Sequence, residues 1–143
     1  SRVAALRYDM GSSPFLGRVI AEMIRNGDLD RHIEGLRRTY LRKLERVEDA
    51  LSRYCADYCS YVRPEGGFFL WLQLRPGLTS RDVQLAANER GVIVGQGPQF
   101  FADGQATNHL RLAFSYVPME EIEEGIQRLG EALAEVAARS AAS

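Results

Sequence analysis

The 143-residue sequence is poor in lysine: it holds seventeen arginines and a single lysine, Lys43. Acidic and basic residues alternate along the chain, and the formal net charge is −1, so the basic blocks typical of nucleic-acid-binding proteins are missing. The apolar stretches are far shorter than the roughly 20 residues of a membrane-spanning helix, and no signal peptide opens the chain. These absences exclude nucleic-acid binding by this segment and a membrane span, and they predict a soluble, cytoplasmic protein.

Cysteine and histidine are also scarce. Cys55 and Cys59 are four residues apart, and His32 and His109 are the only histidines. A zinc site needs more ligands at closer spacing, so we predict two free thiols on one helix face and no metal site. His32 is expected to be solvated, and His109 to be a polar residue at the end of a strand. A Gly-x-Ser-x-Gly motif is absent too, so no serine nucleophile is predicted.

Two helices are predicted at the start of the chain. Ser12 or Ser13, followed by Pro14, is typical of a helix N-terminus, and Asn26-Gly27 of its end. From Asp28 onward, apolar residues recur at helical spacing over about 30 residues, which predicts a helix over about 28–59. Because such a helix is longer than a compact domain of this size requires, we expect it to contact a second domain or another subunit.

The remaining chain alternates between strand and helix signals. We predict a short extended piece at 61–64, strands at 68–74, 92–94 and 108–115, helices at about 79–90 and from Pro118 onward, and fraying from Ala137 to Ser143. This order predicts an α/β fold of the α+β sandwich kind: a small, mainly antiparallel sheet with helices on one face. The other face is then free for a ligand or another domain.

Arg111 is the candidate binding residue. In the segment 108–115, strand alternation puts Leu110, Leu112 and Phe114 on one face, and Arg111 on the other beside small neighbours. A guanidinium with free space around it matches a carboxylate through two parallel hydrogen bonds. The residues alone leave two interpretations open: a carboxylate clamp, or an arginine that is solvated or held in a structural ion pair.

Four motifs, in order, resemble the class I and II aminotransferases, which are fold-type-I enzymes dependent on pyridoxal phosphate. They are Pro-Glu-Gly-Gly-Phe-Phe-Leu-Trp at 64–71; Gly91-Val92 with Gly97 and Phe100; Asn108-His-Leu-Arg-Leu-Ala-Phe-Ser115; and Glu121, Ile122, Gly125, Ile126 and Leu129. The resemblance spans about residues 12–135. It is strongest to 2-aminoadipate and kynurenine aminotransferases and to the aminotransferase domains of MocR-type regulators.

The resemblance implies that residues 1–27 are a remnant of a large, cofactor-binding domain and that 28–143 form the C-terminal small domain. It also implies that Arg111 binds the substrate α-carboxylate and that the intact protein is a homodimer. The family's Schiff-base lysine lies in the large domain, upstream of Ser1. Lys43 stands among charged residues and is expected to be solvated, so this chain alone is expected to bind no cofactor and to be inactive. Gln96 replaces the proline of the family's Pro-Gly pair.

Three functions stay open at this point. The first is part of an aminotransferase that moves an amino group from an amino acid to a 2-oxo acid; lyases, decarboxylases and synthases share its fold. The second is the amino-acid-sensing domain of a MocR-type regulator. The third is a stand-alone carboxylate-binding or interaction module. The absence of an initiator methionine at Ser1 favours a piece of a longer protein.

Overall fold

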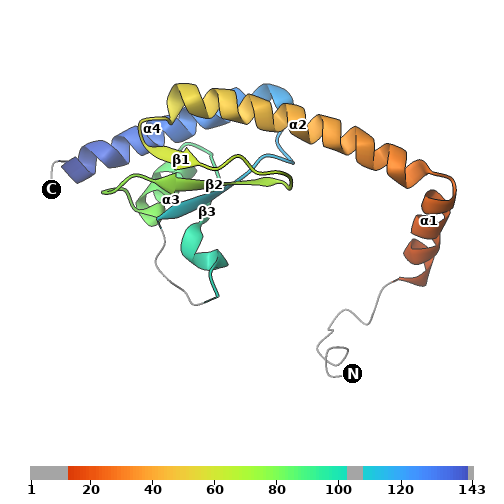
Figure 1. Cartoon of the computed structure of the whole chain (residues 1–143). Helices are drawn as coiled ribbons and strands as arrows, with labels where there is room; N and C mark the ends of the chain where they lie inside the picture. Colours follow the sequence, from red (N-terminus) through yellow and green to blue (C-terminus); the bar gives the residue numbers. More distant parts are fainter. Residues whose placement is uncertain (1–12, 103–107, 142–143) are drawn as a thin grey trace. The chain divides into compact units, whose positions relative to one another are not determined.

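The structure is a computed structural model that describes residues 13–102 and 108–141. The chain divides into two compact units, Ser1–Thr39 and Tyr40–Ser143. In chain order, the elements are α1 (Pro14–Arg25), α2 (Asp28–Tyr54), β1 (Cys59–Tyr61), β2 (Phe69–Leu74), α3 (Ser80–Glu89), β3 (Gly95–Gln96), the 3-10 helix η2 (Gly97–Phe100), β4 (His109–Ala113), the 3-10 helix η3 (Met119–Glu121) and α4 (Ile122–Ala141) (Figure 1).

The first unit holds α1 and the start of α2. The hydroxyl of Ser13 caps α1 by accepting from the amide of Leu16, and Pro14 occupies the first turn. Gly27 follows the helix with a φ of 70°, a left-handed conformation that glycine adopts without strain. The predicted bounds of this helix are therefore confirmed.

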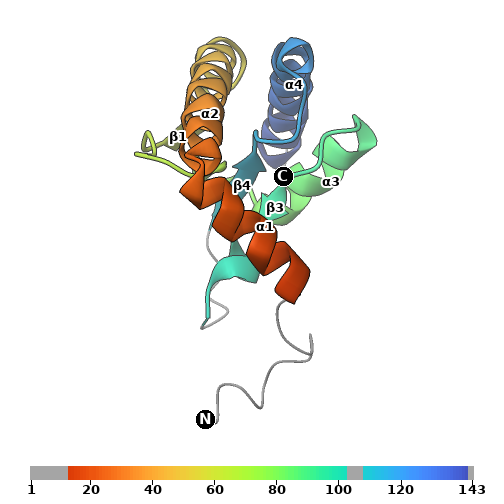
Figure 2. The same cartoon turned by 90° about the vertical axis from the view of Figure 1, so that its right-hand side faces the viewer.

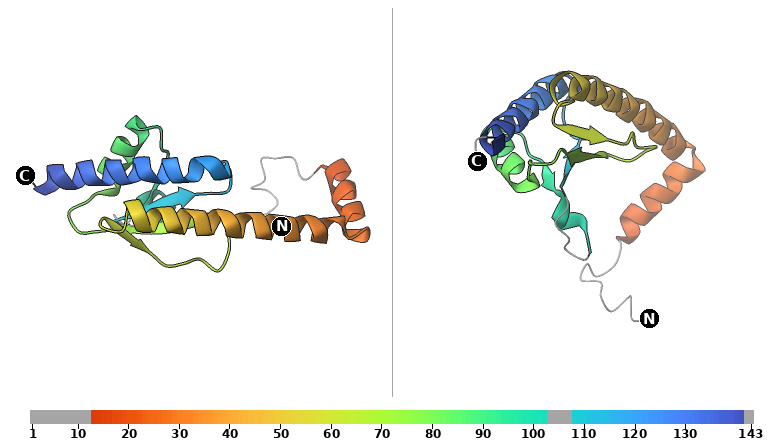
Figure 3. Two further views of the ribbon diagram at one scale, coloured as in Figure 1. Left: turned by 90° about the horizontal axis from the view of Figure 1, so that it is seen from above. Right: turned by 60° about the vertical axis from the view of Figure 1, so that its left-hand side comes forward.

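The second unit is a four-stranded antiparallel sheet in the order β1-β2-β4-β3. The second half of α2 and the first half of α4 run side by side over one face of the sheet, with α3 beside α4 (Figures 2 and 3). Between sheet and helices lies one core, to which β2 and β4 contribute Leu70, Leu72, Leu74, Leu110 and Leu112, and to which Phe114, the residue after β4, also belongs. The predicted fold class is confirmed.

The long helix ends earlier than its apolar spacing predicted. α2 stops at Tyr54, and a turn leads to Cys59, which begins β1 opposite Leu74. The two cysteines are free thiols buried in the core, but they do not share a helix face, so that part of the prediction is wrong. The error has a physical cause, because apolar residues three and four apart also fit a turn followed by a buried strand.

Two further expectations were wrong. Residues 92–94 form no strand: the amide of Val92 donates to the carbonyl of Ala87 at the end of α3, and Ile93 is 87% exposed. The chain end does not fray at Ala137, since α4 continues to Ala141 and the hydroxyl of Ser140 donates to the carbonyl of Gly77 at 2.7 Å.

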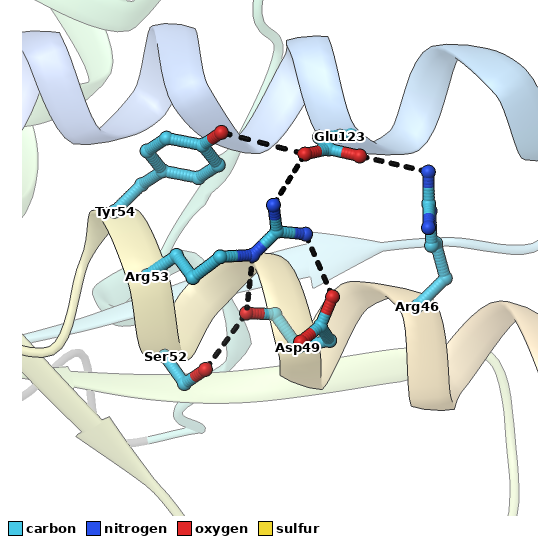
Figure 4. A network of polar contacts seen from close by, with 6 residues as sticks. All are labelled: Arg46, Asp49, Ser52, Arg53, Tyr54 and Glu123. Carbon is cyan, nitrogen blue, oxygen red and sulfur yellow. Dashed lines mark hydrogen bonds and ion pairs between the residues drawn. The ribbon is translucent and has the colours of Figure 1, made fainter.

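Most charged contacts between α2 and α4 meet at Glu123 (Figure 4). Its carboxylate accepts from Arg53 at 2.5 Å, from Arg46 at 2.7 Å and from the Tyr54 hydroxyl at 3.4 Å. Arg53 also pairs with Asp49 at 2.6 Å. The hydrogen bond from Arg53 lowers the pKa of Glu123 below its ordinary value of 4.5, and the charges of Arg53 and Arg46 add to this effect.

We expect Glu123→Gln to reduce the loss of folding stability that occurs as the pH is lowered. A lowered pKa in the folded state means that the stabilisation by Glu123 is complete above pH 4.5 and is lost as the pH falls through the lowered value. Urea unfolding midpoints measured above and below pH 4.5 should therefore differ less in this variant than in the wild type. Glu131→Gln, on the same helix, is the control. Equal pH dependence in the wild type and Glu123→Gln would contradict the account.

Close packing of α4 against the end of α2 depends on Gly130. A Cβ atom at this position would lie 2.5 Å from the backbone oxygen of Tyr54 and 3.1 Å from its Cβ. Neither atom belongs to a mobile side-chain end, so alanine would force the helices apart.

Gly130→Ala should therefore destabilise the protein by about 1–3 kcal/mol. This is the opposite of the usual effect, since alanine normally stabilises a helix by ~1 kcal/mol relative to glycine. Gly125→Ala in the same helix has nothing within 4 Å of the added atom, and should stabilise by up to about 1 kcal/mol. Chemical denaturation of both variants measures this, and shifts of the same sign would disprove the packing argument.

Candidate functional site

The sheet face opposite the helices carries the candidate site. Because side chains alternate along β2 and β4, burying their leucines places Phe69, Trp71, His109, Arg111 and Ala113 on the other face. This face combines one cation with several aromatic rings. It therefore has the chemistry to bind an anion beside an apolar group.

Arg111 lies at the centre of the sheet. It pairs with Trp71 on β2 and with Gly95 on β3, so strands flank it on both sides. The side chain is half-buried, and it forms no ion pair with any residue of 13–102 or 108–141. The alternation that predicted its direction is confirmed, and within those residues the interpretation as a structural ion pair finds no support.

Two aromatic rings hold the guanidinium of Arg111. Its Cζ atom lies 4.3 Å from the ring centroid of Phe69 and 3.9 Å from that of Phe100. Both distances are within the range of cation–π contacts. Such contacts bind the cation through the faces of the rings and leave the N–H donors of the guanidinium available for an acceptor.

The rings extend into a cluster around Trp71. Phe100 meets the indole edge-on with centroids 5.8 Å apart, Phe101 lies 5.9 Å away, and His109 stacks on it at 5.7 Å. The sequence did not predict Phe69 and Phe100 as site residues. Strand alternation places Phe69 on the face of Arg111, but only once the register of β2 and β4 is known.

The loop after α3 carries Phe100 to the site. Gln96, at the position of the family's proline, donates to Gln84 on α3, and Gln84 in turn donates to the carbonyl of Val94 at 2.7 Å. These bonds fix the loop to α3 just before η2. Gln96 therefore maintains the loop by hydrogen bonds where a proline would restrict the backbone.

Lys43 is not solvated, which corrects the expectation from its charged neighbours. Its Nζ atom donates to the carbonyls of Ser115 at 2.6 Å and Val117 at 2.7 Å. The half-buried amine thus links α2 to the segment that follows β4. At the other end of β4, Asn108 donates to the carbonyls of Leu74 and Arg75 and fixes the end of β2.

The remaining reactive groups offer no second site. Burial raises the pKa of the Cys55 thiol to about 12 and that of Cys59 to about 11, so both stay protonated and unreactive. The described residues contain no cluster of histidine, cysteine and carboxylate side chains suited to a metal ion. His32 is exposed, as predicted. No helix in the described part of the chain has the length and apolarity to cross a membrane.

A cavity of about 480 Å³ lies near the start of α4. Its lining includes Ile93, Leu112 and Ile122 but not Arg111. Its one arginine, Arg128, pairs with Glu124, which leaves little positive charge for an anion. Arg111 is therefore the stronger candidate, although it lies on an open sheet face and not in this cavity.

The chain belongs to an aminotransferase family, because the family model described as Aspartate amino-transferase matches residues 21–142. The chain is 32% identical over 133 residues to Aromatic-amino-acid aminotransferase 1 of Thermococcus litoralis. This match covers 93% of this chain and 32% of that protein. It is 28% identical over 134 residues to an uncharacterized HTH-type transcriptional regulator of Bacillus subtilis. This match covers 94% of this chain and 27% of the regulator. The resemblance read from the four motifs is confirmed.

A solved structure supports the same family. The α-aminoadipate aminotransferase of Thermus thermophilus, complexed with N-(5′-phosphopyridoxyl)-L-leucine, matches with a TM-score of 0.77 and 36% identity. The match covers 84% of this chain and 31% of that one. The chain spans about a third of the length of the curated relatives it matches.

Proposed function

We propose that this chain is the C-terminal, substrate-binding part of a pyridoxal-phosphate-dependent aminotransferase, and that Arg111 binds the α-carboxylate of the amino acid or 2-oxo acid. The single observation that carries this proposal is the guanidinium of Arg111, which contacts two rings on the sheet face opposite the helices and has no carboxylate partner among the described residues. Membership of the aminotransferase family supplies the reaction class.

The geometry suits a carboxylate for a physical reason. Two in-plane N–H groups of one guanidinium match the two oxygens of one carboxylate, and this bidentate contact fixes the orientation of the substrate as well as its position. The aromatic neighbours shield part of the contact from water, which strengthens it. Removing one partner of a charge-assisted pair that becomes buried when the ligand binds costs about 2–5 kcal/mol.

The described residues do not fit a pyridoxal phosphate site of their own. An imine with the cofactor requires a lysine amine that is free to react. Lys43 is the only lysine of the chain, and its amine donates to two backbone carbonyls. In this proposal, the cofactor is held by a large domain of the same polypeptide outside this sequence, and this chain contributes substrate binding and orientation.

We expect Arg111→Ala in the full-length protein to abolish discrimination for the carboxylate. The probes are N-(5′-phosphopyridoxyl)-L-leucine and its counterpart without the carboxylate, N-(5′-phosphopyridoxyl)-3-methylbutylamine. The variant should bind the first about 30- to 4,000-fold more weakly and the second as well as the wild type does. Pyridoxal phosphate affinity should not change.

Arg81→Ala is the matched control, since Arg81 is an exposed arginine on α3, away from the sheet face. Isothermal titration calorimetry measures both probes. If Arg111→Ala and Arg81→Ala discriminate between the two probes equally well, Arg111 does not bind the carboxylate and the proposed function is wrong.

A second function is favoured by the likeness to the regulator of Bacillus subtilis. In that case the same clamp would sense an amino acid, and a DNA-binding domain would precede this part of the polypeptide. The probe experiment tests carboxylate binding by Arg111, which both functions require. Operator binding by the full-length protein, measured with and without amino acid, separates them. The homodimer, the cytoplasmic location and the domain boundary after residue 27 stay predictions.

A further inference from the structure

The two rings around Arg111 have different origins in the chain. Phe69 is the first residue of β2, whereas Phe100 is the last residue of η2, and both are partly exposed at 43% and 42%. Each ring faces the guanidinium, at 4.3 Å and 3.9 Å from its Cζ atom. An arginine side chain that is free in solution samples many rotamers, so two ring contacts restrict it strongly.

Gly95 provides the room for this arrangement. A Cβ atom on Gly95 would lie 2.9 Å and 3.1 Å from two ring carbons of Phe100, and 3.4 Å from the Cβ of Arg111. Phe100 therefore occupies the space above the glycine that pairs with Arg111 across the sheet. The hydrogen bond from Gln96 to Gln84 holds the start of η2, and the ring of Phe100 reaches back over Gly95.

We propose that Phe69 and Phe100 are positioning residues, which hold the guanidinium of Arg111 in place and leave its N–H donors free to bind the substrate carboxylate, and that Gly95 is required for Phe100 to do so. This inference rests on the proposed function of Arg111. A neighbouring carboxylate could orient the arginine equally well, but it would occupy the donors and neutralise the charge. Aromatic faces orient the cation without competing for its N–H groups.

The test measures carboxylate selectivity, defined as the ratio of the affinities of the full-length protein for N-(5′-phosphopyridoxyl)-L-leucine and N-(5′-phosphopyridoxyl)-3-methylbutylamine. Phe100→Leu and Phe69→Leu should each lower this ratio roughly 3- to 30-fold, by weakening the first probe and not the second. Gly95→Ala should lower it in the same direction, because the new methyl group displaces the ring of Phe100.

Phe101→Leu is the matched control. Phe101 is the next residue in the chain, is similarly exposed at 37%, and contacts Trp71 and His109 but not the guanidinium. It should leave the selectivity unchanged. Phe100→Trp, which restores a ring face, should recover most of the selectivity lost in Phe100→Leu.

A double-variant cycle separates positioning from general loss of structure. With Arg111 already replaced by alanine, Phe100→Leu should have no further effect on the selectivity, because the group that it positions is gone. An undiminished effect in that background would overturn the inference, as would equal losses in Phe100→Leu and Phe101→Leu. If instead Arg111→Ala itself leaves selectivity intact, the proposed function fails. If Arg111→Ala abolishes selectivity but Phe100→Leu and Phe69→Leu do not lower it, only the positioning inference fails.

Discussion

The register in which β2 pairs with β4 determines where the side chains of the candidate site lie. Leu70 stands opposite Leu112, and Trp71 opposite Arg111, so the leucines of both strands enter the core while the tryptophan and the arginine occupy the other face. A slip of β4 by one residue relative to β2 would turn its side chains to the opposite faces and place the guanidinium in the core, where burying an unpaired charge costs several kcal/mol. The hydrophobic burial that stabilises the sheet thus also positions the cation.

Arginines in this unit serve two different purposes, and their partners distinguish them. Arg46 and Arg53 use their N–H donors on the carboxylate of Glu123 and so connect α2 to α4 (Figure 4). Arg111 has ring faces as partners instead, and it forms no ion pair with a carboxylate of the described residues. The first arrangement consumes the hydrogen-bonding capacity of the guanidinium in the fold, whereas the second holds the group in place and preserves that capacity for a ligand.

Much of the architecture could be predicted from local patterns. Period-two alternation gave the two faces of β4, and helix caps gave the bounds of α1 and α3. Contacts between distant residues could not be read in this way. Lys43 bonds to carbonyls more than seventy residues away, and the contact of Phe100 with Arg111 depends on the pairing of β3 with β4. Periodicity also failed after Tyr54, where the apolar spacing continues through a turn into a strand.

The most direct test of the central claim is a crystal structure of the full-length protein with N-(5′-phosphopyridoxyl)-L-leucine bound. The account predicts that both carboxylate oxygens of the ligand lie about 2.7–2.9 Å from two guanidinium nitrogens of Arg111, with Phe69 and Phe100 on either face of the group. A carboxylate held by other residues, with Arg111 paired to an acidic side chain of the protein, would contradict it.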